Sequence, residues 1–166
     1  MPSNLPHPIA TRRRALVATS LIAAAALPGC GMFGKGSPAT LNANVVASPQ
    51  VNPDVRKRPS PVVVRVFELK SSALFDQADF ISLYEKEAAT LGAELLSRDE
   101  FVLRPGEARS LTKPLSPDTK FIGVMVAYRE IERARWRSLV PVAAGKKNVM
   151  RIELDELAVQ ALRTSP

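Results

Sequence analysis

The chain has 166 residues, a formal net charge of +7, a single cysteine and a single histidine. This length suits one globular domain, and a single cysteine cannot form a disulfide within the chain. The histidine, His7, lies in an amino-terminal segment that we expect to be removed. Without histidine or a free thiol, the remaining chain cannot build a Ser-His-Asp triad, a Cys-His pair or a typical zinc site. The composition therefore excludes most hydrolase mechanisms.

The first 29 residues have the organisation of a bacterial secretion signal. Three consecutive arginines, 12–14, precede an uncharged, alanine-rich run over residues 15–27. Such a run is too short to span a bilayer stably. The sequence Leu27-Pro28-Gly29-Cys30 then resembles the lipobox of bacterial lipoproteins, in which the thiol is acylated and becomes the new amino terminus. We predict lipidation of Cys30, and an ordinary signal peptide cut nearby, leaving a free thiol, is the alternative.

The lipid on Cys30 is the only non-protein group that the sequence predicts, and no cofactor or metal is expected. Several acyl chains hold a protein firmly to a bilayer. Gly31 follows the cysteine, where an aspartate would resemble an inner-membrane retention signal, so we expect the outer membrane, facing the periplasm. Residues 30–37 would form a lipidated tether and residues 38–166 the folded domain. Loss of the signal leaves 20 basic and 16 acidic residues, a net charge of +4.

Several segments of the domain alternate apolar and polar residues with the period of two that is typical of half-buried strands. We expect strands at Thr40–Ala47, Val62–Leu69, Phe101–Leu103, Phe121–Tyr128, Trp136–Val142 and Met150–Leu154, and a weaker one at Ala108–Leu111. About seven short strands without a disulfide predict a mainly β fold, a sandwich of two sheets.

One stretch near residues 72–91 breaks the β pattern and predicts a helical insertion. A short helical turn over Ser72–Asp76 would precede a helix from Asp79, whose start either Asp76 or Asp79 can cap, and Gly92 suits the left-handed residue after its end. Its apolar residues share one predicted stripe: Phe80, Tyr84, Ala88 and Leu91. We expect this insertion to cover one edge or end of the sandwich and to shield strand edges.

The connection between the first two expected strands, residues 48–61, has 14 residues and four prolines. Connections this long are usually functional or disordered, and prolines make the chain stiffer. Arg56, Lys57 and Arg58 place three positive charges at its centre, and we expect Val51 and Val55 to be apolar residues in an exposed setting. This combination predicts a protein-binding loop with an apolar anchor and a charged rim. A disordered connector is the alternative.

Three arginines with a spacing of two, Arg133, Arg135 and Arg137, would lie on one face of the strand that contains Trp136. Such a row is usually a solvated outer face. A sequence pI near 10.0 also suggests nucleic-acid binding. An exported domain of charge +4 without a stacking motif argues against that function.

The sequence contains two patterns that could be catalytic, and we interpret neither as an active site. Ser110-Leu111-Thr112-Lys113 matches the Ser-x-x-Lys pattern of penicillin-binding enzymes, but the two companion motifs are absent. A polar turn before Pro114 is the favoured interpretation. The carboxylate pairs Asp99-Glu100 and Glu130/Glu132 could act as acid and base, but solvated charges are the simpler explanation.

Several short motifs in a fixed order resemble the TssJ family, the outer-membrane lipoproteins of the bacterial type VI secretion system. They are Arg65–Lys70, Phe75–Phe80, Leu83-Tyr84, Leu103–Gly106, Ile122–Val124, Tyr128–Glu130 and Trp136-Arg137. The resemblance runs from Cys30 to about Leu154, and Pro28 departs from the usual lipobox. It implies a transthyretin-like β-sandwich with an added helical element.

The same resemblance implies a non-enzymatic role, which is to anchor the secretion membrane complex by binding the periplasmic carboxy-terminal region of TssM, an inner-membrane protein. It places the contact in the loop between the first two strands, here the segment made of Gln50, Val51, Asn52, Pro53, Asp54, Val55, Arg56, Lys57, Arg58 and Pro59. A periplasmic carrier that holds a small ligand or glycan between its sheets, and an enzyme acting on peptidoglycan, are the alternatives.

Overall fold

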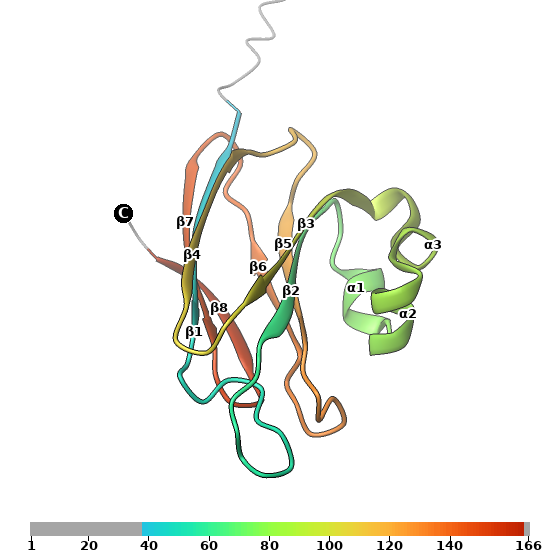
Figure 1. Ribbon diagram of the computed structural model, residues 1–166. Coiled ribbons are helices and arrows are strands. Elements are labelled where there is room, and N and C mark those ends of the chain that lie inside the picture. Colours follow the sequence, from blue (N-terminus) through green and yellow to red (C-terminus); the bar gives the residue numbers. More distant parts are fainter. Residues whose placement is uncertain (1–37, 165–166) are drawn as a thin grey trace, which may run out of the picture. The chain divides into compact units, whose positions relative to one another are not determined.

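The computed structural model describes residues 38–164, which form two four-stranded sheets and a helical segment (Figure 1). The strand order is β4-β1-β7-β8 in the first sheet and β3-β2-β5-β6 in the second. The bounds are β1 Thr40–Ala47, β2 Val62–Leu69, β3 Leu95–Leu103, β4 Ala108–Pro114, β5 Phe121–Ala127, β6 Arg137–Pro141, β7 Lys147–Leu154 and β8 Val159–Thr164. Strands β1 and β7 run parallel, and the other hydrogen-bonded neighbours are antiparallel. The predicted mainly β, two-sheet fold is confirmed.

The structure contains one strand that the sequence analysis missed, β8, and a β3 that begins earlier than predicted. The inward-facing residues in the first half of β3 are the polar residues Ser97 and Asp99. Both accept hydrogen bonds from Lys113 of β4. The apolar signal with period two is therefore absent there. In strand β8, only the side chains of Val159 and Ala161 are buried in the core.

Apolar side chains from both sheets fill the space between them. The core includes Leu41 and Val45 of β1, Val64 of β2, Val124 of β5 and Ile152 of β7, all fully buried. Burial of this kind is the main stabilising contribution to a small domain. The two layers therefore share one core that needs no disulfide.

Three short helices and a 3-10 turn lie between β2 and β3. Their bounds are α1 Ala73–Gln77, α2 Phe80–Glu85, α3 Glu87–Leu91 and η1 Gly92–Glu94. Asp79 caps α2 as predicted, because its carboxylate accepts hydrogen bonds from Ser82 N at 2.9 Å and Ser82 Oγ at 2.7 Å. Among residues 38–164, no helix is both long and apolar enough to cross a membrane.

The predicted helical stripe was wrong for half of its members. The chain breaks between α2 and α3 at Lys86, where φ is −134° and ψ is 35°. This break changes the phase of the residues that follow it, so Leu91 is buried while Ala88 is exposed. Before the break, Leu83 is the buried residue of α2, and Tyr84 is exposed and stacks on Phe80. The helical period of 3.6 residues applies only within an unbroken helix.

The helices cover the outer face of the second sheet, and not an edge or end as predicted. Phe75 and Leu83 pack with Phe67 of β2 and Met125 of β5 in a second hydrophobic cluster. A Cβ atom on Gly123 would lie 3.0 Å from the Phe75 ring. Glycine at this position of β5 therefore lets the ring lie directly on the sheet.

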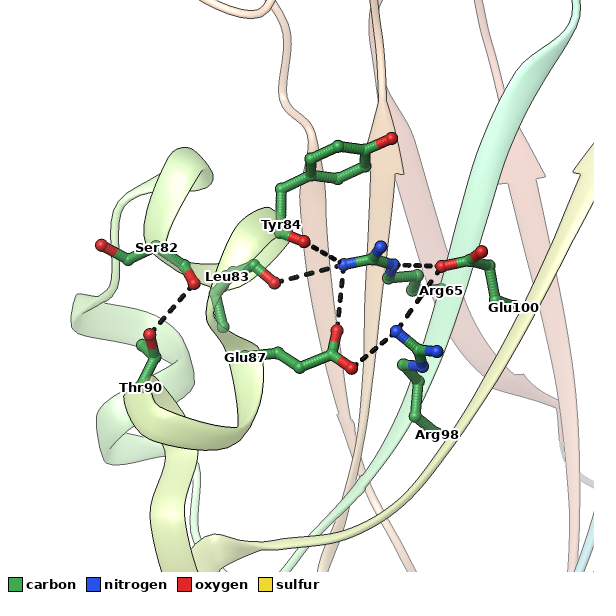
Figure 2. A network of polar contacts seen from close by, with 8 residues as sticks. All are labelled: Arg65, Ser82, Leu83, Tyr84, Glu87, Thr90, Arg98 and Glu100. Atoms are coloured by element: carbon green, nitrogen blue, oxygen red, sulfur yellow. Dashed lines mark hydrogen bonds and ion pairs between the residues drawn. The ribbon is translucent and has the colours of Figure 1, made fainter.

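Arg65 of β2 holds the break between α2 and α3 against the sheet (Figure 2). Its Nη1 donates to Tyr84 O at 2.6 Å and to the Glu87 carboxylate at 2.9 Å, and its Nε donates to Glu100 at 2.5 Å. Arg98 binds the other Glu87 oxygen at 2.6 Å. The planar guanidinium thus satisfies carbonyl groups that the interrupted helix leaves free.

Candidate partner-binding loop

The predicted binding loop, residues 48–61, joins β1 of the first sheet to β2 of the second (Figure 1). It has a buried base and an exposed tip. The base consists of Val51, Asn52, Pro53 and Ser60, which are buried, and the tip consists of residues 54–58. The alternative of a disordered connector does not describe this loop, because hydrogen bonds fix both parts.

Val51 is part of the hydrophobic core, so its predicted exposed setting was wrong. Its side chain is fully buried among residues of both sheets. Its backbone N–H donates to Ser48 O at 3.1 Å, and its carbonyl accepts from Ser60 N at 3.1 Å. An apolar side chain at the base of this loop closes the end of the sandwich, and a partner cannot reach it.

Asn52 ties the loop base to two other connections, a role that the sequence analysis did not identify. Its Nδ2 donates to Pro61 O at 2.8 Å, and its Oδ1 accepts from Arg129 N at 2.8 Å. Its backbone N–H donates to Glu156 O at 3.0 Å. The residue adopts a φ of 51°, a left-handed conformation that asparagine tolerates better than most residues. The β5–β6 and β7–β8 connections therefore lie beside the loop.

The tip is a tight turn organised by Asp54. Asp54 N donates to Arg58 O at 2.9 Å, and Lys57 N, at a φ of 63°, donates to Asp54 O at 2.8 Å. The Asp54 carboxylate accepts from Arg56 N at 2.8 Å, from Arg58 N at 3.0 Å and from Arg58 Nε at 2.7 Å. These hydrogen bonds lower the pKa of Asp54. The largest effect comes from the Arg58 backbone N–H, and the next largest comes from the Arg58 side chain. The turn is therefore ordered before any partner binds.

The tip presents one apolar side chain and two cations. Val55 is 92% exposed, which is unusual for an aliphatic residue in a fixed turn. Arg56 and Lys57 are exposed in the turn, whereas Arg58 forms an ion pair with Asp54 at 2.7 Å. An exposed aliphatic group with charged neighbours resembles the anchor and rim of a small protein interface.

The connection between β5 and β6 lies beside the tip and adds to its exposed surface. Pro53, Asp54 and Val55 line a shallow depression of about 310 Å³ together with Arg129 and Glu130. This contribution was not predictable from the sequence, because no spacing rule links two loops that are about 75 residues apart. The candidate site therefore consists of the tip and the start of the β5–β6 connection.

The three arginines at 133, 135 and 137 do not form the predicted solvated row. Arg133 lies in a turn and pairs with Glu130 at 2.7 Å, and Arg135 forms an isolated bridge with Ala158. Arg137 Nη1 donates to Phe75 O at 2.9 Å and to Ala78 O at 2.7 Å. Arg137 therefore caps the carboxyl end of α1 and does not face solvent with the others.

The Ser-x-x-Lys pattern lies in strand β4 and not in the predicted turn. In a strand, a spacing of three puts Ser110 and Lys113 on opposite faces, so they cannot share a proton. Lys113 Nζ instead binds Glu68 at 2.6 Å and Asp99 at 2.8 Å. Among residues 38–164, no group of three side chains is arranged to hold a metal ion.

Glu68 is a buried carboxylate at the other end of the sandwich from the loop. It accepts hydrogen bonds from Ser97 Oγ at 2.6 Å, Ser116 N at 3.0 Å and Thr119 Oγ1 at 2.8 Å, in addition to its pair with Lys113. Burial raises the pKa of this carboxyl, but the hydrogen bonds from Lys113 and the other donors outweigh burial and lower it. The group is therefore held ionised as a structural element.

Cys30, the predicted lipidation site, lies outside the described residues. The same holds for the signal segment 1–29 and the tether 30–37. Their assignments stay predictions.

Comparison with protein families matches residues 39–157 to the family described as type VI secretion lipoprotein, VasD, EvfM, TssJ, VC_A0113. This stretch includes β1 to β7 and the whole candidate loop. Comparison with curated proteins found no match.

Solved structures show the same fold. TssJ1 from Pseudomonas aeruginosa is 32% identical with a TM-score of 0.75, and the match covers 78% of this chain and 98% of that one. Serratia marcescens Lip, a membrane bound component of the type VI secretion system, is 26% identical with a TM-score of 0.69, over 74% and 96%. A chain of a structure described as the TssM C-terminal domain from EAEC is 24% identical with a TM-score of 0.63, over 75% and 98%. The chain therefore belongs to the TssJ family of type VI secretion lipoproteins.

Proposed function

We propose that this protein is a non-enzymatic adaptor that binds the periplasmic carboxy-terminal region of TssM through the tip of the β1–β2 loop. A lipid on Cys30 would anchor it to the outer membrane, facing the periplasm. The observation that carries the proposal is the ordered tip, which exposes Val55 together with Arg56 and Lys57, the two residues that follow it. Because hydrogen bonds to Asp54 fix the turn, little conformational entropy is lost when a partner binds.

Family membership supports this choice of partner. The family consists of type VI secretion lipoproteins. A related fold occurs in a structure described by the TssM C-terminal domain, which makes TssM the first partner to test. The exposed Arg56 and Lys57 lead us to expect an acidic surface on the TssM segment.

The carrier alternative needs a ligand cavity between the sheets. That space is occupied by the buried side chains of the first hydrophobic cluster, which includes Val64, Val124 and Ile152. The enzyme alternative needs a nucleophile with a base, and Lys113 is engaged by two carboxylates. The adaptor is therefore the function that the described residues support best.

The proposal is tested by calorimetric titration of residues 38–166 with the TssM segment. The double substitution Arg56→Glu and Lys57→Glu leaves the Asp54–Arg58 pair intact, and we expect it to weaken binding at least about tenfold. The matched control, Lys120→Glu with Lys146→Glu, changes the same net charge away from the loop and should leave the affinity unchanged. Equal affinities of the loop variant and the unmodified domain would contradict the proposal.

A further inference from the structure

The two ends of the sandwich differ in what they are attached to. The described chain begins next to Thr40, the first residue of β1, and the binding loop follows its last residue, Ala47 (Figure 1). We call these the attachment end and the loop end. At about 3.3 Å per residue, β1 separates them by about 23 Å. Because the chain is continuous, the tether of residues 30–37 joins the domain at the attachment end.

At the attachment end, backbone hydrogen bonds link the connections between strands to one another and to the start of β1. Thr40 N donates to Lys146 O at 3.1 Å, which joins the start of β1 to the β6–β7 turn. Lys120 N donates to Leu69 O at 2.9 Å, and Val142 N donates to Lys120 O at 2.8 Å. The β4–β5 connection, the β6–β7 turn and the first residue of β1 therefore form one surface.

This surface carries lysines without acidic partners. Within residues 38–164, no ion pair includes the three exposed lysines of the attachment end: Lys120, Lys146 and Lys147. Two acidic groups, Asp118 and Glu94, lie nearby, and neither forms an ion pair with these three lysines among the described residues. Asp118 lies 3.6 Å from Lys70, and the Glu94 carboxylate accepts a hydrogen bond from Leu74 N at 3.4 Å. The attachment end therefore has an excess of free positive charge.

A buried asparagine fixes the turn that carries two of these lysines. Asn148 is fully buried, and its Oδ1 accepts from Ala143 N at 2.8 Å. Its Nδ2 donates to Ala143 O at 3.1 Å and to Lys146 O at 3.0 Å. Gly145 supplies the φ of 66° that the turn needs. The lysine side chains thus project from an ordered backbone.

The loop end carries charges of both signs. Arg56 and Lys57 have no ion pair among the described residues, whereas Arg58 pairs with Asp54 and Arg133 pairs with Glu130, each at 2.7 Å. Nearby Asp155 and Glu156 add negative charge in the β7–β8 connection. Cations without an ion pair therefore occur at both ends, but at the attachment end they lie beside the residue where the tether joins the domain.

We propose that the attachment end is a docking surface for anionic phospholipid headgroups. This inference rests on the proposed lipid anchor, which would keep the surface within reach of a bilayer. Ammonium groups bind phosphate as point charges, and each lysine close to an anionic membrane strengthens binding about fivefold. The attraction acts over a Debye length of about 8 Å at physiological ionic strength. Docking in this way holds the sandwich upright on the membrane and points the loop tip away from it.

The test uses the lipidated protein in vesicles. Cys30 is the only cysteine of the chain, so Ala144→Cys in the β6–β7 turn can carry a single environment-sensitive dye once Cys30 is acylated. We compare vesicles of phosphatidylcholine alone with vesicles that also contain phosphatidylglycerol, using a quencher at headgroup depth. We expect quenching to rise in the anionic vesicles and to return to the zwitterionic level in high salt.

The variants identify the side chains responsible. The triple substitution Lys120→Gln, Lys146→Gln and Lys147→Gln should abolish the extra quenching in anionic vesicles. The control Arg56→Gln with Lys57→Gln, at the loop end, should retain it. Flotation of the vesicles reports the anchor separately, because acyl chains hold the protein whatever its orientation.

The outcomes distinguish the anchor from the docking surface. A protein that does not float contradicts the proposed anchor. A protein that floats but shows equal quenching in both kinds of vesicle contradicts the docking surface, as does a triple variant that is quenched like the unmodified protein. Loss of TssM binding in the triple variant, with quenching unchanged, would assign the lysines to the protein partner and overturn the inference.

Discussion

Val51 and Val55 occupy opposite environments although only three residues separate them in the β1–β2 loop. Val51 is fully buried in the core, and Val55 is 92% exposed at the tip. Asn52, Pro53 and Asp54 carry the chain from one environment to the other, and Asn52 does so with its left-handed backbone. One valine therefore contributes to stability, and the other is free to contribute to binding.

Alanine substitutions separate these two roles. We expect Val51→Ala to lower the free energy of unfolding by about 2 kcal/mol, because it removes buried methyl groups and leaves a cavity. Val55→Ala should change stability by less than about 0.5 kcal/mol but weaken TssM binding by about fivefold or more. Denaturant unfolding and calorimetric titration measure the two effects. A Val51→Ala variant of normal stability with weakened binding would contradict this division.

Glu68 makes the free energy of unfolding of the domain depend on pH in the acidic range. Its pKa is lower in the folded state, so it contributes stability above its unfolded pKa, about 4.3, and this contribution is lost as the pH falls through the folded pKa. We expect Glu68→Gln to lower the free energy of unfolding by about 2 kcal/mol at neutral pH and to flatten its decline in acid. Unfolding curves between neutral pH and about pH 3 measure this. Glu132→Gln, at an exposed residue, is the control and should retain the decline.

At the scale of the elements, the sequence predicted the strands well where one side faces an apolar core. The alternation in β1 and the dense β-branched run in β2 gave their bounds correctly, because burial of one or both faces determines those residues. It failed in the first half of β3, where Ser97 and Asp99 face a buried ion pair. Where the inward-facing residues of a strand are polar, the sequence does not alternate between apolar and polar residues, so this pattern cannot reveal the strand.

The helices and the loop show a second limit of sequence-based prediction. The helix start at Asp79 was predictable because capping is local. The break at Lys86 was not, because Arg65 stabilises it from a strand about 20 residues away. In the same way, the 48–61 loop was recognisable from its prolines and charges, but the burial of Val51 depends on both sheets.

Arg65 provides a test of the helical segment. A lysine at position 65 would keep the positive charge. Its single ammonium group could not bind Tyr84 O, Glu87 and Glu100 together, as the guanidinium of Arg65 does. We expect Arg65→Lys to speed hydrogen exchange in α2 and α3 selectively, because these helices would open before the sandwich unfolds. Arg151→Lys, at an exposed pair with Glu153, is the control. Uniform acceleration over both sheets would contradict a local role for Arg65.

At the scale of the whole domain, the sandwich acts as a rigid spacer between its two ends. The core joins β1 to β2 and β5, so the loop tip and the attachment end cannot move independently. A lipid on Cys30 would fix one end to the membrane, and the tip would then be presented to a partner that crosses the periplasm. We therefore propose that the tip, and not another surface, contacts TssM.

Photo-crosslinking in cells that assemble the secretion complex tests this claim most directly. A photoreactive amino acid is placed at position 55 of the tip or at position 144 of the β6–β7 turn, both of which are exposed. We expect a crosslink to TssM from position 55 and none from position 144. A TssM crosslink from position 144, with none from position 55, would contradict it.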